Sequence, residues 1–187
     1  MTKLILLLFS MTLFSCGQKG TSETTVPVTE VKKAPATTAP SFNADSAYAY
    51  VEKQVSFGYR VPNTSAHKAC GDYLVSELKR FGAQVYEQEA TLKAYDGTPL
   101  ESRNIIGSFN PDKDKRILLF AHWDTRPYSD HDPDPANHKK PLDGADDGAS
   151  GVGALLEIAR QMGMKAPEVG VDIIFFDAED YGTPEFA

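Results

Sequence analysis

The chain has 187 residues, of which 41% are hydrophobic and 24% are charged, and 26 acidic against 19 basic side chains give a formal net charge of −7. This composition is typical of a globular protein, and the length suits one domain of ordinary size. The acidic balance argues against a nucleic-acid-binding protein, which normally carries a basic face. Two cysteines exclude a disulfide framework. After the first twenty residues, no segment of the sequence is continuously apolar over the length of a membrane span, which excludes a protein with several membrane spans.

The N-terminus has the pattern of an export signal. Lys3 gives a short basic start, and an apolar run over residues 4–14 is too short for a comfortable membrane span but suits a signal peptide. Residues 13–17, Leu-Phe-Ser-Cys-Gly, resemble a bacterial lipobox. We therefore expect residues 1–15 to be a lipoprotein signal peptide and Cys16 to be lipidated, with an ordinary signal peptide and an incidental cysteine as the alternative. The lipid would anchor the protein in the bacterial cell envelope, facing the periplasm.

Residues 16–40 are rich in Thr, Pro, Ala, Val and Lys and show no usable periodicity. Such a segment buries too little apolar surface to order itself, so we expect a disordered tether. The folded part is expected over residues 41–187. With Cys16 acylated, Cys70 has no cysteine partner within the chain and is expected to be a small buried helix residue.

The pattern from residue 41 onward predicts helices and strands in an α/β order. Asn43 or Asp45 can cap the first helix, and Gly82 suits a left-handed cap after the second. Residues 117–120 are continuously apolar, which is typical of a strand buried on both faces, and residues 171–176 are expected to form a second apolar strand. The expected helices cover about 43–55, 65–81 and 150–162, and the expected strands cover about 84–92, 104–109, 116–121 and 171–176.

Three polar clusters follow these elements at corresponding points. Residues 122–126, His-Trp-Asp-Thr-Arg, come directly after one apolar strand, and residues 177–180, Asp-Ala-Glu-Asp, come directly after the other. Residues 143–151, Asp-Gly-Ala-Asp-Asp-Gly-Ala-Ser-Gly, lead into the third helix. In an open α/β sheet the loops past the carboxyl ends of the strands meet in one crevice. The three clusters are therefore expected to converge there.

Converging acidic loops would repel one another unless a cation compensates their charge, and imidazole with carboxylates is a donor set for zinc. Of the adjacent acids Glu179 and Asp180, one could hold the metal while the other acts as a base. Each cluster taken alone also has a structural explanation. Asp146 and Asp147 could form a turn and helix cap, His122 could end a strand, and residues 177–180 could be a solvated loop. The joint pattern favours a metal site.

These residues also resemble a known family. The segments 120–127, 144–151 and 176–182 are similar to the metal-site motifs of the zinc aminopeptidase superfamily, and more narrowly to its bacterial glutaminyl-peptide cyclotransferase branch. The segments 60–64, 66–67 and 70–74 fit that branch as well. The resemblance runs from about Ser41 to the end of the chain. It implies a three-layer α/β/α fold around a mixed, mostly parallel sheet.

The resemblance implies an enzyme that converts the N-terminal Gln of peptides or proteins to pyroglutamate with release of ammonia. Asp147 and Asp180 would be zinc ligands, and Glu179 would be the general acid and base, which requires a carboxylate whose pKa is raised by burial. One Zn²⁺ suffices in this reading, with His122 and Asp124 supporting the ligands. A zinc aminopeptidase is the alternative, in which His122 binds a second Zn²⁺ and Asp147 bridges the two metals.

Two departures from the family pattern stand out. The commoner pattern has two glutamates where this chain has Glu179 and Asp180, and the family's last zinc ligand is a histidine far downstream, whereas His138 is the last histidine here. We therefore expect the third zinc ligand to lie outside this chain, and the chain alone to expose a strand edge. His131 and His138 are poor substitutes because both lie in a polar loop. A third alternative is a non-catalytic lipoprotein that binds peptides.

Overall fold

The computed structural model describes residues 40–187, so the expected signal peptide, Cys16 and nearly all of the expected tether lie outside the described part. The helices are α1 (Ala44–Ser56), α2 (Ser65–Arg80) and α3 (Ala149–Met164). The strands are β1 (Gln84–Lys93), β2 (Pro99–Phe109), β3 (Arg116–His122) and β4 (Gly170–Phe176), and a short 3₁₀ helix covers Pro135–Asn137. All seven expected helices and strands are present. The strand β2 begins at Pro99 rather than near residue 104, because it pairs with β1 along its whole length.

Local chemistry accounts for the helix ends. Asn43 caps α1 by accepting a 2.9 Å hydrogen bond from the Ser46 amide, so Asn43 rather than Asp45 is the cap. Thr64 caps α2 in the same way through the His67 amide, at 3.1 Å. At the other end of α2, Gly82 has a φ of +88° and the chain reverses into β1, as the sequence predicts.

The four strands form one mixed sheet in the order β1-β2-β4-β3. The pairs β1–β2 and β2–β4 are antiparallel, and the pair β3–β4 is parallel. The mixed α/β fold is confirmed. Because β3 and β4 run in the same direction, their carboxyl ends lie at the same edge of the sheet, which brings the polar clusters that follow them together.

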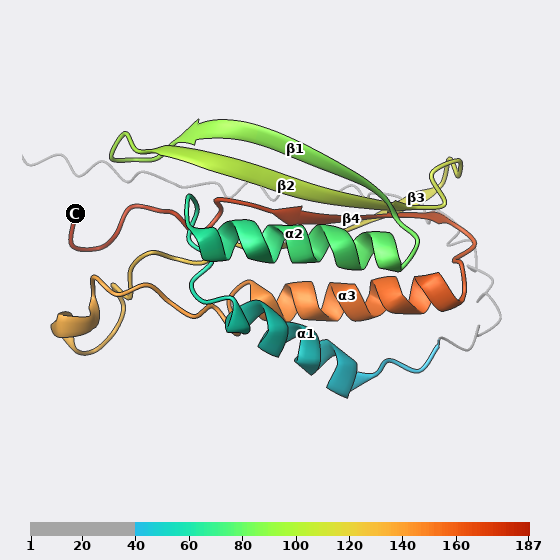
Figure 1. Cartoon of the computed structure of the whole chain (residues 1–187), viewed down its shortest axis with the longest axis horizontal. Coiled ribbons are helices and arrows are strands. Elements are labelled where there is room, and N and C mark those ends of the chain that lie inside the picture. The colour runs from blue at the N-terminus through green and yellow to red at the C-terminus, as the bar shows by residue number, and fades with distance from the viewer. Residues whose placement is uncertain (1–39) are drawn as a thin grey trace, which may run out of the picture. The chain divides into compact units, whose positions relative to one another are not determined.

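All three helices lie on one side of the sheet (Figure 1), with α2 over β1 and β2 and α3 over β3. Their apolar faces meet β4, whose Ile173 and Phe175 are fully buried. Cys70 is also fully buried in this core, as expected for a small helix residue. The described residues therefore form two of the three expected layers. No helix of residues 40–187 is long and apolar enough to cross a bilayer.

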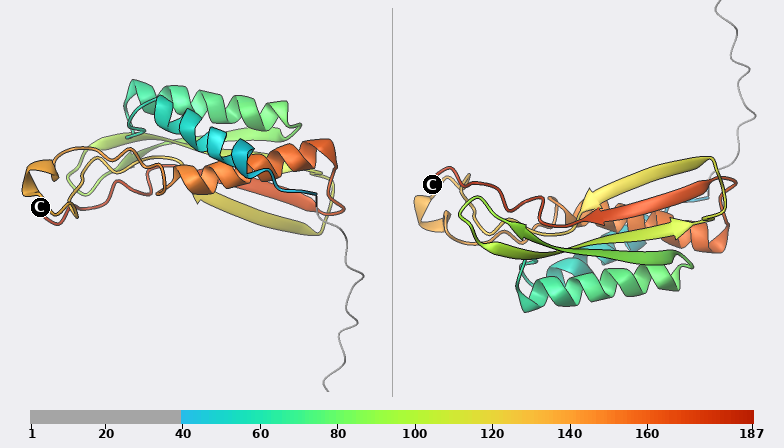
Figure 2. Two further views of the ribbon diagram at one scale, coloured as in Figure 1. Left: turned by 90° about the horizontal axis from the view of Figure 1, so that it is seen from below. Right: turned by 90° about the horizontal axis from the view of Figure 1, so that it is seen from above.

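The expectation that residues 117–120 are buried on both faces is wrong for the described chain. Leu118 and Phe120 are 54% and 64% exposed, because β3 is the edge strand and the face away from α3 has no covering layer among the described residues. Figure 2 shows β3 and β4 with no helix over this face. The expectation of an exposed strand edge is correct.

Candidate active site

The two expected strand-end clusters do meet, and the loop before α3 joins them. His122 is the last residue of β3, and its Nε2 lies 2.9 Å from Oδ1 of Asp147, which precedes α3. Its Nδ1 lies 3.9 Å from Oε2 of Glu179, which follows β4. The structure thus places an imidazole and carboxylates from all three predicted clusters within a few ångströms of one another.

Buried Asp124 holds His122 and the loop after β4 in place. Its side chain is fully buried, and its two carboxylate oxygens accept hydrogen bonds from the amides of Glu179 and Asp180, at 3.2 and 3.1 Å. Asp124 Oδ1 also lies 3.6 Å from Nδ1 of His122. Together with Asp147, Asp124 raises the pKa of His122 to about 9. Asp124 therefore orients both the imidazole and the loop after β4.

Asp180 is the most buried of the acids expected to bind the metal. Its side chain is 14% exposed, and the pKa of its carboxyl rises to about 6, first because of burial and then because of the negative charges of Asp147 and Asp124. Arg126 lies beside it and donates a hydrogen bond to the Asp180 carbonyl at 3.2 Å. The carboxylates repel one another in this arrangement, and a bound cation would relieve that repulsion.

Glu179 does not match the expectation of burial. Its side chain is 64% exposed, because it points away from the core at the open edge of the cluster and none of the described segments covers it. Asp147 is similarly open, with 70% of its side chain exposed. The position of Glu179 next to the cluster is thus as expected, but the described residues do not supply the enclosure that would tune a general acid and base.

The loop that carries Asp147 is held by a buried arginine. Arg60 is fully buried, and its Nη1 and Nη2 donate hydrogen bonds to the carbonyls of Asp143 and Gly144 at 2.9 and 2.8 Å. A Cβ atom at Gly144 would lie 2.3 Å from Thr125 Cγ2, so only glycine permits this close approach. Burial lowers the pKa of Arg60, whose partners here are carbonyl oxygens. In the sequence, Arg60 is marked only by its place in the segment 60–64, which carries part of the family resemblance.

The donors fit zinc in kind, but those of the described chain do not complete a site. Asp147, Asp180 and His122 supply the carboxylate and imidazole groups that zinc prefers. The Nδ1 atom of His122 is buried and has no hydrogen-bond partner in this part of the protein, since Asp124 Oδ1 lies 3.6 Å away, beyond ordinary hydrogen-bond distance. However, no group of three or more His, Cys, Asp or Glu side chains within residues 40–187 has an arrangement that could hold a metal ion.

The two remaining histidines of the polar loop do not join the cluster. His131 lies 3.3 Å from Glu185, and His138 lies 2.9 Å from the Asp132 carbonyl. Trp123 lies between His122 and Asp124 in the sequence. Its side chain is fully buried and packs in the hydrophobic core.

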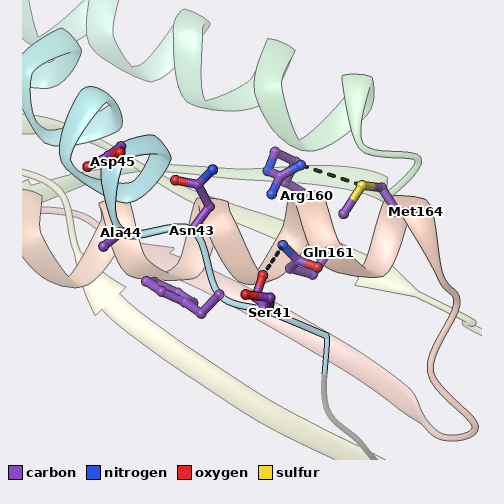
Figure 3. A pocket seen from close by; sticks show the side chains of 8 residues that line it. Ser41, Asn43, Ala44, Asp45, Arg160, Gln161 and Met164 are labelled. Atoms are coloured by element: carbon purple, nitrogen blue, oxygen red, sulfur yellow. Dashed lines mark hydrogen bonds between the residues drawn. The ribbon is translucent and has the colours of Figure 1, made fainter.

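One cavity of the described chain lies away from this cluster. It has a volume of about 520 Å³ and lies between the start of α1 and the last turns of α3, where Gln161 donates a 3.0 Å hydrogen bond to the Ser41 carbonyl (Figure 3). Arg160 and Met164 line it as well. None of the expected site residues lines this cavity, so it is separate from the candidate active site.

Comparison with known proteins agrees with this geometry. Residues 104–184 match peptidase family M28, and this segment contains every residue that the sequence analysis places in the metal site. The matched segment includes Asp180. Arg60, which holds the loop before α3, lies more than forty residues before the start of that segment.

Solved structures extend the similarity to most of the chain. A Zn-dependent exopeptidase from Parabacteroides distasonis is 79% identical over 80% of this chain, with a TM-score of 0.79. A glutaminyl cyclase from Tannerella forsythia is 69% identical over 79% of the chain, with a TM-score of 0.78. A glutaminyl cyclase from Bacteroides thetaiotaomicron is 63% identical over 80%, with a TM-score of 0.79. The match covers 51% of each of these three chains, so this chain spans about half of their length.

Proposed function

We propose that this chain forms part of the active site of a zinc-dependent glutaminyl-peptide cyclotransferase. The observation that carries the proposal is the meeting of Asp147, His122 and the Glu179-Asp180 pair at one edge of the sheet. The high identity to two glutaminyl cyclases supports this reading. The substrate would be a peptide or protein with an N-terminal Gln.

In this proposal Asp147 and Asp180 bind zinc, and the remaining protein ligand comes from outside the described residues. Bound zinc would act as a Lewis acid on the γ-carbonyl oxygen of the substrate glutamine. The raised pKa of Asp180 supports its assignment, because a cation stabilises the charged form of a carboxylate that burial and then the charges of Asp147 and Asp124 destabilise. His122 and Asp124 support the ligands when one zinc is present, and we propose one zinc.

Glu179 moves the proton in the proposed reaction. The α-amine of the substrate attacks the γ-carbonyl carbon, and Glu179 accepts the proton that this nitrogen releases. The bond between the γ-carbon and the amide nitrogen then breaks, Glu179 gives the proton to the departing nitrogen, and ammonia leaves. The five-membered lactam of pyroglutamate remains. The hydrogen bond from the Glu179 amide to buried Asp124 holds the backbone of the acid in place during both transfers.

We also propose that the protein is exported and anchored by a lipid at Cys16, in the bacterial envelope and facing the periplasm. The lipobox-like segment 13–17 supports this proposal. Replacing Cys16 with Ser should release the protein from the membrane fraction, whereas retention of the variant there would contradict a lipid anchor at this residue.

The decisive experiment tests the full-length protein that contains this chain on two peptides and compares the products. A Gln-initiated and a Leu-initiated peptide are incubated separately and followed by mass spectrometry. Loss of 17 mass units, about one ammonia, from the Gln peptide alone would support the cyclotransferase. Release of free leucine would instead indicate an aminopeptidase, and an unchanged pair of peptides would favour a non-catalytic binding protein.

Two variants assign the roles within the site. Glu179→Gln should abolish turnover while zinc stays bound, because the amide keeps the shape but cannot carry the proton. Asp147→Asn should lose zinc, and Asp146→Asn is its matched control, since Asp146 is the adjacent, exposed acid of the same loop. Wild-type turnover in Glu179→Gln would refute its assignment as acid and base.

A further inference from the structure

A buried His–Asp pair lies behind the candidate site. Nε2 of His67, in the first turn of α2, is 2.8 and 2.9 Å from the two carboxylate oxygens of Asp177, the residue directly after β4. Their side chains are 7% and 0% exposed. A buried carboxylate needs donors to offset the loss of water, and His67 supplies one from a helix that is 110 residues away in the sequence.

Asp177 also holds the start of the loop that follows it. Its Oδ2 accepts a 2.7 Å hydrogen bond from the Arg103 amide in β2, and its Oδ1 accepts one of 2.8 Å from the Ala178 amide. Ala178 has a φ of +58°, which a non-glycine residue adopts only when its surroundings hold it there. The turn at Ala178 sets the direction in which Glu179 and Asp180 leave the strand.

The imidazole of His67 is itself fixed by stacking. It lies parallel to the ring of Trp123, with centroids 4.2 Å apart and an interplanar angle of 15°. Trp123 follows His122, and its amide donates a 3.0 Å hydrogen bond to the Phe176 carbonyl at the end of β4. The His67 ring thus touches both strand-end loops, one through Trp123 and the other through Asp177.

We propose that His67 is a positioning residue of the active site, which acts through Asp177 to set the backbone from which Glu179 and Asp180 project. Asp124 holds the amides of those two acids from one side, and the His67–Asp177 pair holds the start of the same loop from the other. The part of this inference that concerns Glu179 rests on the proposed function, because Glu179 acts only in that reaction. The part that concerns Asp180 requires only that the site binds zinc.

The test uses three substitutions of His67 in the full-length protein. His67→Phe keeps a ring against Trp123 but removes the donor to Asp177. His67→Gln retains an N–H donor with nearly the reach of Nε2, and His67→Asn retains a donor on a shorter side chain. Zinc affinity is measured by competition with a chelator, and kcat and KM for a Gln-initiated peptide are measured on zinc-loaded protein.

We expect His67→Phe to weaken zinc binding about 10-fold or more and to lower kcat about 100-fold, with KM changing less than kcat. His67→Gln should recover most of both quantities, and His67→Asn should fall between. If His67→Phe does not fold, the test is whether His67→Gln has a higher kcat than His67→Asn at equal zinc occupancy. Zinc affinity and kcat that stay within about threefold of the parent in all folded variants would overturn the proposal.

Two controls separate positioning from general destabilisation. Leu74→Ala removes a fully buried side chain from the same helix, so it should lower the melting temperature without changing kcat per zinc-loaded molecule. Equal losses of kcat in Leu74→Ala and His67→Phe would overturn the proposal. His131→Phe, at a histidine whose side chain is 74% exposed, should change neither quantity. If the parent shows no cyclase activity, the proposed function fails, while the zinc affinities still test the role of His67.

Discussion

Removing the guanidinium of Arg60 should both destabilise the fold and loosen the loop that carries Asp147. The perturbation is Arg60→Met, which keeps an unbranched but shorter side chain and has no donor. In the native protein two short hydrogen bonds, at 2.9 and 2.8 Å, join this buried guanidinium to the carbonyls of Asp143 and Gly144. A longer bond of 3.3 Å reaches the carbonyl of Trp123.

The magnitude follows from these contacts. A hydrogen bond to a charged group contributes about 1.5–3 kcal/mol, so the two short bonds together are worth roughly 3–6 kcal/mol. Part of this is regained, because Arg60→Met no longer buries a charge, and burial already lowers the pKa of Arg60. We expect a net loss of about 2–4 kcal/mol in the free energy of unfolding.

The assay is urea unfolding of the full-length protein, followed by chelator competition for zinc. The matched control is Arg80→Met, because Arg80 is an exposed arginine that pairs with Glu77 within α2 and should contribute less than about 1 kcal/mol. A loss below about 1 kcal/mol in Arg60→Met, or a loss of stability with unchanged zinc affinity, would refute the view that Arg60 anchors the metal-site loop.

Three further outcomes are expected. Burial raises the pKa of the Cys70 thiol to about 12, so iodoacetamide should label Cys70 at least about 100-fold more slowly in native protein than in urea, which peptide mass spectrometry measures. Hydrogen bonds from Arg160 lower the pKa of Glu157 from 4.5 to about 2, so its contribution to stability is complete above about pH 4.5 and is lost as the pH falls toward 2. Glu157→Gln should therefore flatten the decline of the urea midpoint across that range, and an unaltered slope would contradict this. Residues 40–187 expressed alone should self-associate through the open sheet face, so Leu118→Lys should raise the monomer fraction in sedimentation, whereas Tyr48→Lys on α1 should not.

The parts of the fold that local patterns encode were predictable from the sequence. The sequence predicts a cap at Asn43 or Asp45 and a turn at Gly82 from the chemistry of single residues, and the structure has the cap at Asn43 and the turn at Gly82. The meeting of His122 with Glu179 follows from two apolar strands that each end in a polar cluster. It needed only that these strands be parallel neighbours, which they are.

The parts that depend on distant partners were not predictable. Arg60 contacts Gly144 across 84 residues and His67 contacts Asp177 across 110, and neither pair leaves a periodic trace in the sequence. The exposure of Leu118 was missed for a related reason. An apolar run shows that a strand is suited to burial on both faces, but not whether a second layer of the same chain covers it.

Several unfavourable features of residues 40–187 lie at the candidate site. Three buried side-chain atoms of the described part have no hydrogen-bond partner, and two of them are Nδ1 of His122, at the end of β3, and Oγ1 of Thr125, in the loop that follows. The left-handed backbone of Ala178 and the raised pKa of Asp180 belong to the loop after β4. Sequences that fold well normally avoid such local conflicts, and they persist mainly where function requires them. A cation between these loops would lower the pKa of Asp180 and offset the repulsion, so the strain itself supports a metal site here.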